Sequence, residues 1–230
     1  MKRVVLTHGW GFGEAVWRPL ADALRVRGWR VGLAGLPGFD GRPARPAEAW
    51  CSALARQVPE GALWVAWSLG GRLALQAVAA GQARPAGLCL IGVGDRFVAG
   101  DGAGLPERAF EDFRAGLAEP GRLLRRFAAL VAQGDPAARQ VLRFLRGLSP
   151  AASAETLAHG LELLRSPLPE RLPELCCALV RGSADALVPA AAAAALAGRL
   201  PGAGLYQPEA GHAPQLSAPG VVLDCLEAMA

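Results

Sequence analysis

Short, continuously apolar segments alternate with longer helical patterns along most of this chain. Five apolar runs have the length of strands: residues 4–6, 63–67, 88–93, 175–180 and 203–206. Such runs are typical of strands that are buried on both faces of a sheet. Ala- and Leu-rich stretches with helical character follow several of them, as at 70–80 and 189–198. The alternation across residues 1–93 and 173–230 predicts an α/β fold, with a mostly parallel sheet and helices on both faces.

Residues 94–172 have a different pattern, without a convincing strand. Helical stretches are expected at 107–117, 121–133, 136–147 and 151–165, separated by turns that contain residues such as Pro106, Pro120, Pro136 and Pro150. A helical segment inserted between two halves of a sheet is interpreted as a cap, or lid, over an active site. We therefore expect one core made of residues 1–93 and 173–230 that carries one inserted cap, residues 94–172.

The most specific motif is Ala66-Trp67-Ser68-Leu69-Gly70, which lies between an apolar run and a helical run. This arrangement matches the G-x-S-x-G nucleophile elbow of the α/β-hydrolase fold, in which a serine on a sharp strand-to-helix turn projects from the sheet. Ala66 departs from the usual first glycine, and its single methyl group is expected to fit. The alternative interpretation is a structural turn without chemistry.

A serine nucleophile needs a base, and the base needs an acid that orients it. In α/β-hydrolases these residues follow the serine in the order acid, then histidine. His212 lies in a loop before the last helix, whereas His8 comes too early and His159 lies inside a helical run. Asp185 follows an apolar run, 27 residues before His212. We favour Asp185 as the acid; Asp95, which also follows a strand-like run, is the rival.

A glycine-rich loop follows the first apolar run at residues 7–13. In this fold such a loop supplies one backbone N–H to an oxyanion hole, and the residue after the nucleophile supplies the other. The candidates are therefore the amides of Trp10 and Leu69. A dinucleotide or phosphate site is disfavoured because neither G-x-G-x-x-G nor the P-loop motif is present. His8 is interpreted as a residue that braces this loop.

Composition narrows the class of protein. The chain has 230 residues, of which 52% are hydrophobic, and a formal net charge of +4. No apolar run approaches the ~20 residues that a membrane span needs, and the first residues enter a strand, so no targeting segment is visible. Five cysteines, an odd number, do not suggest a disulfide framework. We expect a cytoplasmic monomer without a metal site or a cofactor.

A basic cluster lies within the expected cap. Arg122 and Arg126 are four residues apart, as are Arg139 and Arg143, so each pair shares one helix face. A solvated helix face is one interpretation, and the other is a docking surface for an acidic partner, because guanidinium groups bind carboxylates and phosphates. Nucleic acid is disfavoured because no aromatic or glycine-rich strand platform accompanies the arginines.

The chain resembles the pimeloyl-acyl-carrier-protein methyl ester esterases of biotin synthesis. The resemblance rests on Leu6-Thr7-His8-Gly9-Trp10-Gly11, Leu36-Pro37-Gly38-Phe39, Ala66-Trp67-Ser68-Leu69-Gly70-Gly71, Gly160-Leu161-Glu162-Leu163-Leu164, Asp185-Ala186-Leu187-Val188-Pro189 and Gly211-His212-Ala213-Pro214. It implies a triad of Ser68, Asp185 and His212, an oxyanion hole at Trp10 and Leu69, and carrier-protein binding by Arg122, Arg126, Arg139 and Arg143. The chain departs from the family at Ala66, at Gly35 and in its short N-terminus.

The expected function is therefore hydrolysis of the methyl ester of pimeloyl-acyl-carrier protein by a serine carboxylesterase. One alternative is a broad-specificity short-chain esterase or lactonase of the same fold with no carrier-protein partner, because fold and triad alone do not determine the substrate. A ligand receptor without catalytic activity is the alternative from a different class.

Overall fold

A computed structural model describes residues 2–148 and 152–230. Its centre is one sheet of six parallel strands in the order β2-β1-β3-β4-β5-β6. The strands are β1 (Arg3–Thr7), β2 (Arg30–Leu33), β3 (Leu63–Trp67), β4 (Gly87–Ile91), β5 (Cys176–Val180) and β6 (Gly204–Tyr206). The expected α/β class is thus confirmed, and every one of the six strands is parallel to its neighbours.

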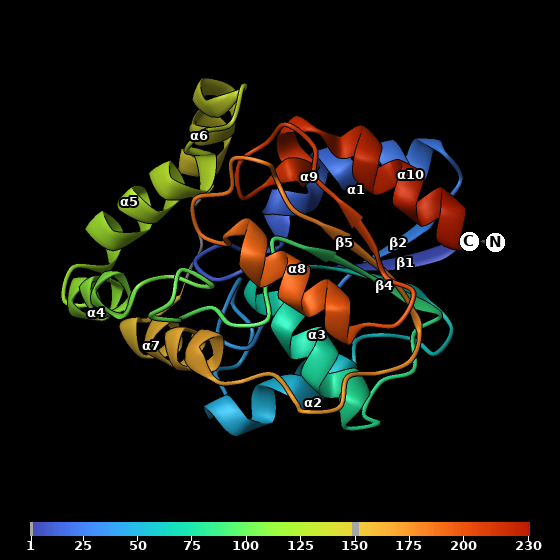
Figure 1. The fold of residues 1–230 in the computed structure, drawn as a ribbon, viewed down its shortest axis with the longest axis horizontal. Coiled ribbons are helices and arrows are strands. Elements are labelled where there is room, and N and C mark those ends of the chain that lie inside the picture. Colours follow the sequence, from blue (N-terminus) through green and yellow to red (C-terminus); the bar gives the residue numbers. More distant parts are fainter. Residues whose placement is uncertain (1, 149–151) are drawn as a thin grey trace.

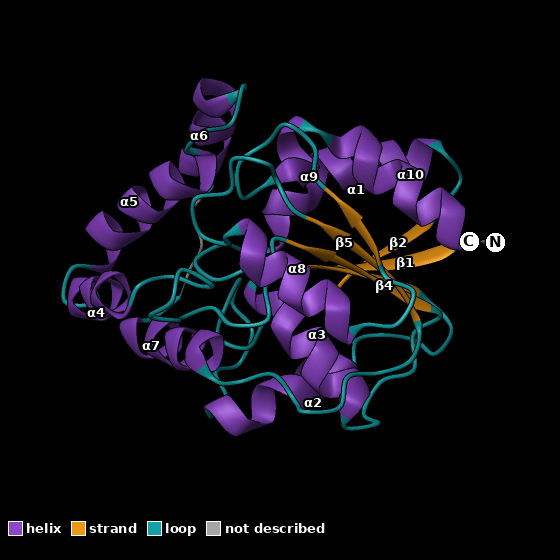
Figure 2. Cartoon of the chain, in the orientation of Figure 1, coloured by secondary structure: helices purple, strands orange, loops and turns teal. Residues whose placement is uncertain are grey.

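Helices cover both faces of this sheet (Figure 1 and Figure 2). On one side lie α1 (Arg18–Val26), α9 (Pro214–Ser217) and α10 (Pro219–Met229), and on the other α2 (Trp50–Ala55), α3 (Leu69–Ala79) and α8 (Ala190–Arg199). Every residue of β3 and β4 is buried, because both faces of these central strands are covered. Five tryptophans, among them Trp10, Trp64 and Trp67, are fully buried in the core.

The segment between β4 and β5 carries four helices that project beside the sheet (Figure 1). They are α4 (Glu107–Gly116), α5 (Pro120–Ala132), α6 (Ala138–Arg146) and α7 (Ala154–Arg165), called the inserted helices below. Their bounds differ from the predicted ones by at most three residues, and the start of α4 and the end of α7 coincide with the prediction. Positions 150 and 151, predicted as a turn and a helix start, lie outside the described residues.

The strand order places a candidate site at the carboxyl ends of the central strands β1 and β3. Strand β2 lies on one side of β1, whereas β3, the next strand along the chain, lies on the other side, so the strand order reverses between β1 and β3. Ligands of open α/β sheets bind outside the carboxyl ends of the strands at such a reversal. Ser68 directly follows β3, and the glycine-rich loop directly follows β1.

Candidate active site

Ser68 occupies a strained backbone conformation between β3 and α3. Its φ and ψ are 53° and −118°, and positive φ is uncommon for a residue with a side chain. Such strain costs roughly 1–3 kcal/mol and persists only where the surrounding structure holds it. Here the Ser68 N–H donates to Ile91 O at 2.8 Å, and the Ser68 carbonyl accepts from the amides of Gly71 and Arg72.

Small residues around Ser68 allow this turn to form. A Cβ at Gly70 would lie 2.5 Å from the carbonyl oxygen of His8, so the loop after β1 passes directly against the first turn of α3. Ala66 is fully buried and keeps its place in the ladder, opposite Thr7 of β1 and Leu90 of β4. The methyl group of Ala66 is therefore accommodated without loss of strand pairing.

Asp185 and His212 form a buried pair. His212 Nδ1 and Asp185 Oδ2 are 2.8 Å apart, and both side chains are inaccessible to solvent. The other carboxylate oxygen, Oδ1, accepts from the amides of Leu187 and Val188. Burial alone would raise the pKa of Asp185, but attraction to His212 and these hydrogen bonds hold it below its ordinary value. An ionised Asp185 orients His212 with Nδ1 as donor and Nε2 as acceptor.

The rival acid lies elsewhere. Asp95 forms an ion pair with Arg199, and its backbone N–H donates to Ala192 O. The structure therefore brings Asp185, and not Asp95, to the His212 ring.

Neighbours of Ser68 contact His212. Trp67, the residue before Ser68, donates its indole N–H to His212 O at 2.8 Å. A Cβ at Gly92, which follows the Ile91 that holds the Ser68 amide, would lie 2.8 Å from His212 Cε1. His212 Nε2 is buried and has no hydrogen-bond partner among the described residues. No hydrogen bond joins it to the Ser68 hydroxyl here; such bonds are often long until substrate is bound.

The loop after β1 lies close to Ser68. A Cβ at Gly9 would be 3.1 Å from Ser68 Cβ. Leu69 is the first residue of α3, so its N–H has no acceptor within the helix. Trp10, in the same loop as Gly9, donates its indole N–H to Leu157 O of α7 at 2.8 Å. The backbone at Trp10 is thereby tied to the inserted helices.

His8 is bound to its own loop. Its ring is fully buried, Nδ1 is 2.9 Å from Gly9 O, and Nε2 accepts from the amide of Leu36. Burial lowers the pKa of His8, which is consistent with a neutral ring that both donates and accepts. The predicted bracing role is confirmed by these contacts.

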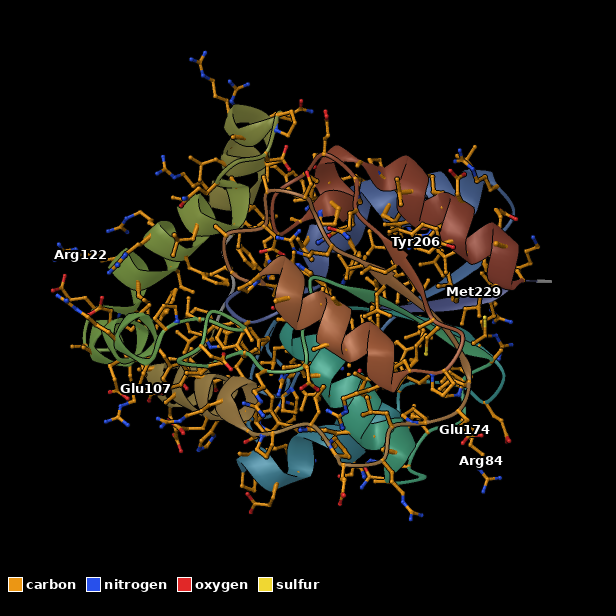
Figure 3. All side chains as sticks on the ribbon, viewed as in Figure 1. Arg84, Glu107, Arg122, Glu174, Tyr206 and Met229 are labelled. Carbon is orange, nitrogen blue, oxygen red and sulfur yellow. The ribbon has the colours of Figure 1, made fainter. Side chains whose placement is uncertain are left out.

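The arginines of the basic cluster are all exposed: Arg122, Arg126, Arg139 and Arg143, together with Arg125 and Arg146. Arg122 projects from the outer end of α5 (Figure 3) and lies 3.7 Å from Glu119. The other five form no ion pair with the part of the chain that the structure describes. Most of this positive charge is thus not neutralised within the chain.

A groove of about 320 Å³ lies beside two of these arginines, Arg125 and Arg146. It is lined by Gly11 and Phe12, which follow Trp10, and by residues of α5 and α6 that include Leu124, Leu145, Arg125 and Arg146. Apolar walls and two guanidinium groups therefore border the same space.

Two residues that the sequence pattern does not single out also touch the His212 loop. They are Trp67, which belongs to the elbow motif, and Asp135, the one acidic residue among residues 120–147. No local sequence signal identifies them, because Trp67 contacts His212, 145 positions away, and Asp135 contacts Gly211, 76 positions away.

Within residues 2–148 and 152–230, no three His, Cys, Asp or Glu side chains are grouped to hold a metal ion. No helix in this part of the chain is long and apolar enough to cross a membrane.

Comparisons with known proteins identify relatives that match nearly the whole chain. The model of the "Alpha/beta hydrolase family" matches residues 4–224. A pimeloyl-[acyl-carrier protein] methyl ester esterase of Aromatoleum aromaticum is 40% identical, with 94% of this chain and 93% of that protein covered. The biotin biosynthesis bifunctional protein BioHC of Cellvibrio japonicus is 37% identical, covering 85% of this chain and 40% of that protein.

Among solved structures, an esterase of Exiguobacterium antarcticum matches with a TM-score of 0.84 at 17% identity, covering 99% of this chain and 91% of that chain. At this identity the match concerns the fold alone. The family match and the close relative together show that this chain belongs to the alpha/beta hydrolase family, and within it to the pimeloyl-[acyl-carrier protein] methyl ester esterases.

Proposed function

We propose that this chain is a serine carboxylesterase that hydrolyses the methyl ester of pimeloyl-acyl-carrier protein in biotin synthesis. The observation that carries the proposal is the buried Asp185–His212 pair, 2.8 Å apart, at the sheet edge where Ser68 is held with positive φ. The relatives support the substrate: their names specify this methyl ester and biotin biosynthesis. The reaction would take place in the cytoplasm.

The proposed reaction passes through an acyl-enzyme. The Ser68 proton moves to His212 Nε2 as Oγ bonds to the ester carbonyl carbon, and the carbonyl electron pair moves to oxygen. Collapse of this intermediate expels the methoxy group, which takes the proton from His212 and leaves as methanol. Water then attacks the acyl-enzyme, with His212 again as base, and releases the free carboxylate. Asp185 stabilises the protonated ring in each half.

We assign the oxyanion hole to the backbone N–H groups of Trp10 and Leu69. The close approach of Gly9 to Ser68 and the open N–H at the start of α3 support this assignment. Removing one donor from such a hole typically costs about 2.7–4 kcal/mol of transition-state stabilisation.

We assign the inserted helices to a cap, residues 94–172, that receives the carrier protein. The exposed guanidinium groups of Arg122, Arg126, Arg139 and Arg143 suit an acidic protein surface and a phosphate. The groove between α5, α6 and the loop after β1 would take the arm that joins the carrier to its ester, because Gly11 and Phe12, which follow Trp10, line it.

The first experiment compares kcat/KM for the carrier-linked methyl ester with kcat/KM for the same ester without its carrier. We expect a preference for the carrier-linked ester that weakens with added salt, because exposed charges are screened. The double variant Arg122→Glu/Arg143→Glu should lower kcat/KM for the carrier-linked ester by about tenfold or more, and leave the free ester unaffected. Ser68→Ala should turn over neither ester.

The matched control is Arg56→Glu/Arg84→Glu, which makes the same change of charge at exposed arginines of the core. Figure 3 shows Arg84 on the opposite side of the molecule from Arg122. Equal loss with both substrates, or equal loss in both double variants, would contradict the docking surface and leave a broad-specificity esterase. Turnover by Ser68→Ala would contradict the mechanism itself.

A further inference from the structure

The turn between α5 and α6 packs against both loops of the Asp185–His212 pair. A Cβ at Gly134 of this turn would lie 2.8 Å from Ala184 Cβ, beside Asp185. A Cβ at Gly211, beside His212, would lie 2.8 Å from Val131 O at the end of α5. The inserted helices therefore pack directly against the loops that carry Asp185 and His212.

Asp135, which lies in this turn, is buried, with 5% of its surface exposed. Its carboxylate accepts three hydrogen bonds, one from the turn and two from the other side of the contact. Oδ1 accepts from the amide of Ala137, within the turn itself, at 2.8 Å. Oδ2 accepts from the amide of Gly211 at 2.8 Å and from the hydroxyl of Ser217 at 2.6 Å. Gly211 and Ser217 lie on either side of His212, so one carboxylate oxygen holds the His212 loop from both ends.

The backbone of His212 is held by two different parts of the fold. Its N–H donates to Val131 O of α5 at 3.0 Å, and its carbonyl accepts from the Trp67 indole of β3 at 2.8 Å. The sheet therefore holds one side of the residue and the inserted helices hold the other. Among the described residues only Asp185 forms a hydrogen bond with the His212 ring, so the direction of Nε2 depends also on both backbone anchors.

We propose that Asp135 is a positioning residue for His212, a role that rests on the proposed function of His212 as base. Asp135 touches neither Ser68 nor His212 by its side chain; it acts through Gly211 and Ser217. Removal of its carboxylate frees the Gly211 amide and the Ser217 hydroxyl together, and lets the loop shift. A displacement of 1 Å at a catalytic group can lower the rate by about 100-fold.

The experiment uses the monomethyl ester of pimelate without a carrier, so that docking does not enter the result. We expect Asp135→Ala to lower kcat by about 10- to 100-fold with little change in KM, and to slow the labelling of Ser68 by a fluorophosphonate in parallel. Ser217→Ala, which removes one of the two contacts to the loop, should give a smaller fall. Ser217→Thr, which keeps the hydroxyl, should restore kcat.

The matched control is Ser153→Ala, also in the inserted helices. Ser153 caps α7 by accepting from the amide of Thr156, and among the described residues no hydrogen bond joins its side chain to the His212 loop. It should lower the melting temperature and leave kcat unchanged.

The outcomes separate this proposal from the proposed function. If His212→Ala loses activity while Asp135→Ala and Ser217→Ala keep the wild-type kcat, the positioning role is wrong and the base assignment stands. If His212→Ala keeps its activity, both are wrong. If Asp135→Ala does not fold, the two variants of Ser217 test the proposal. A lower kcat for Ser217→Ala than for Ser217→Thr supports it, and an equal kcat for both variants overturns it.

Discussion

At the scale of single residues, the site depends on groups held in unfavourable surroundings. Ser68 keeps positive φ because its N–H donates to Ile91 O after β4 and its carbonyl accepts from two amides in the first turn of α3. Asp185 is buried, and it stays ionised only because His212 and two backbone amides compensate for lost hydration. Each of these residues is more sensitive to a change in its partners than an exposed residue would be.

Replacing Asp185 by asparagine should lower kcat by about 10⁴-fold, because an amide cannot stabilise a protonated His212 or hold it in the same tautomer. Single-turnover acylation with the free methyl ester measures this step directly. A fall of less than tenfold would indicate that another group orients His212.

The same residue predicts a dependence of stability on pH. The pKa of Asp185 is lower in the folded state than its ordinary value of 3.8, so its ionisation favours folding. That contribution is present above pH 3.8 and is lost as the pH falls through the lower, folded pKa. Urea unfolding of the wild type should therefore lose stability below about pH 4 more steeply than unfolding of Asp185→Asn.

At the scale of elements, the inserted helices are anchored to the core at positions that also serve the site. Trp10 joins the loop after β1 to α7 through its bond to Leu157 O, and its ring packs on Phe127 of α5. The α5–α6 turn holds the His212 loop. Strands β1, β3, β4, β5 and β6 follow from apolar runs, whereas the half-buried β2 and the short α2 are not predicted by the sequence pattern. Their sequences carry weak patterns, and pairing with β1 and packing on α3 define them.

Replacing Trp10 by phenylalanine tests the anchor on α7. The change removes the indole donor to the Leu157 carbonyl, which keeps its bond within α7, and one such hydrogen bond typically contributes about 0.5–1.5 kcal/mol to the free energy of unfolding. Trp17→Phe is the matched control: Trp17 is equally buried, but its indole N–H has no partner among the described residues. Denaturant unfolding of both variants gives the difference. Equal destabilisation would show that lost volume, and not the hydrogen bond, accounts for the effect.

At the scale of the whole molecule, charge and reactivity are unevenly distributed. Residues 120–147 contain six arginines and one acidic residue, so their net charge of about +5 exceeds the +4 of the entire chain. The positive charge therefore gathers on α5 and α6. Thiol reactivity is distributed differently: three of the five cysteines are buried in the core, and only Cys176 is exposed.

Burial raises the pKa of Cys51, Cys177 and Cys225 to about 11 and that of Cys89 well above its ordinary value. At pH 8 roughly one in a thousand of the first three thiols is ionised, and the thiolate is the reactive form. Iodoacetamide should therefore modify only the exposed Cys176 in the native protein, and all five cysteines after unfolding. Intact-mass spectrometry counts the adducts. Rapid modification of a second cysteine in the native protein would reveal local opening of the core.

The sequence by itself determined the α/β class, the position of the inserted helices, the elbow at Ser68 and the candidates for acid and base. These features depend on short apolar runs and on residues next to one another along the chain. Only the tertiary structure decided that Asp185 meets His212 while Asp95 meets Arg199, and that Asp135 holds the His212 loop. These contacts join residues 27 to 104 positions apart. Which residues meet depends on how the loops at the carboxyl ends of the strands pack against one another. No pattern within a short stretch of sequence determines that packing.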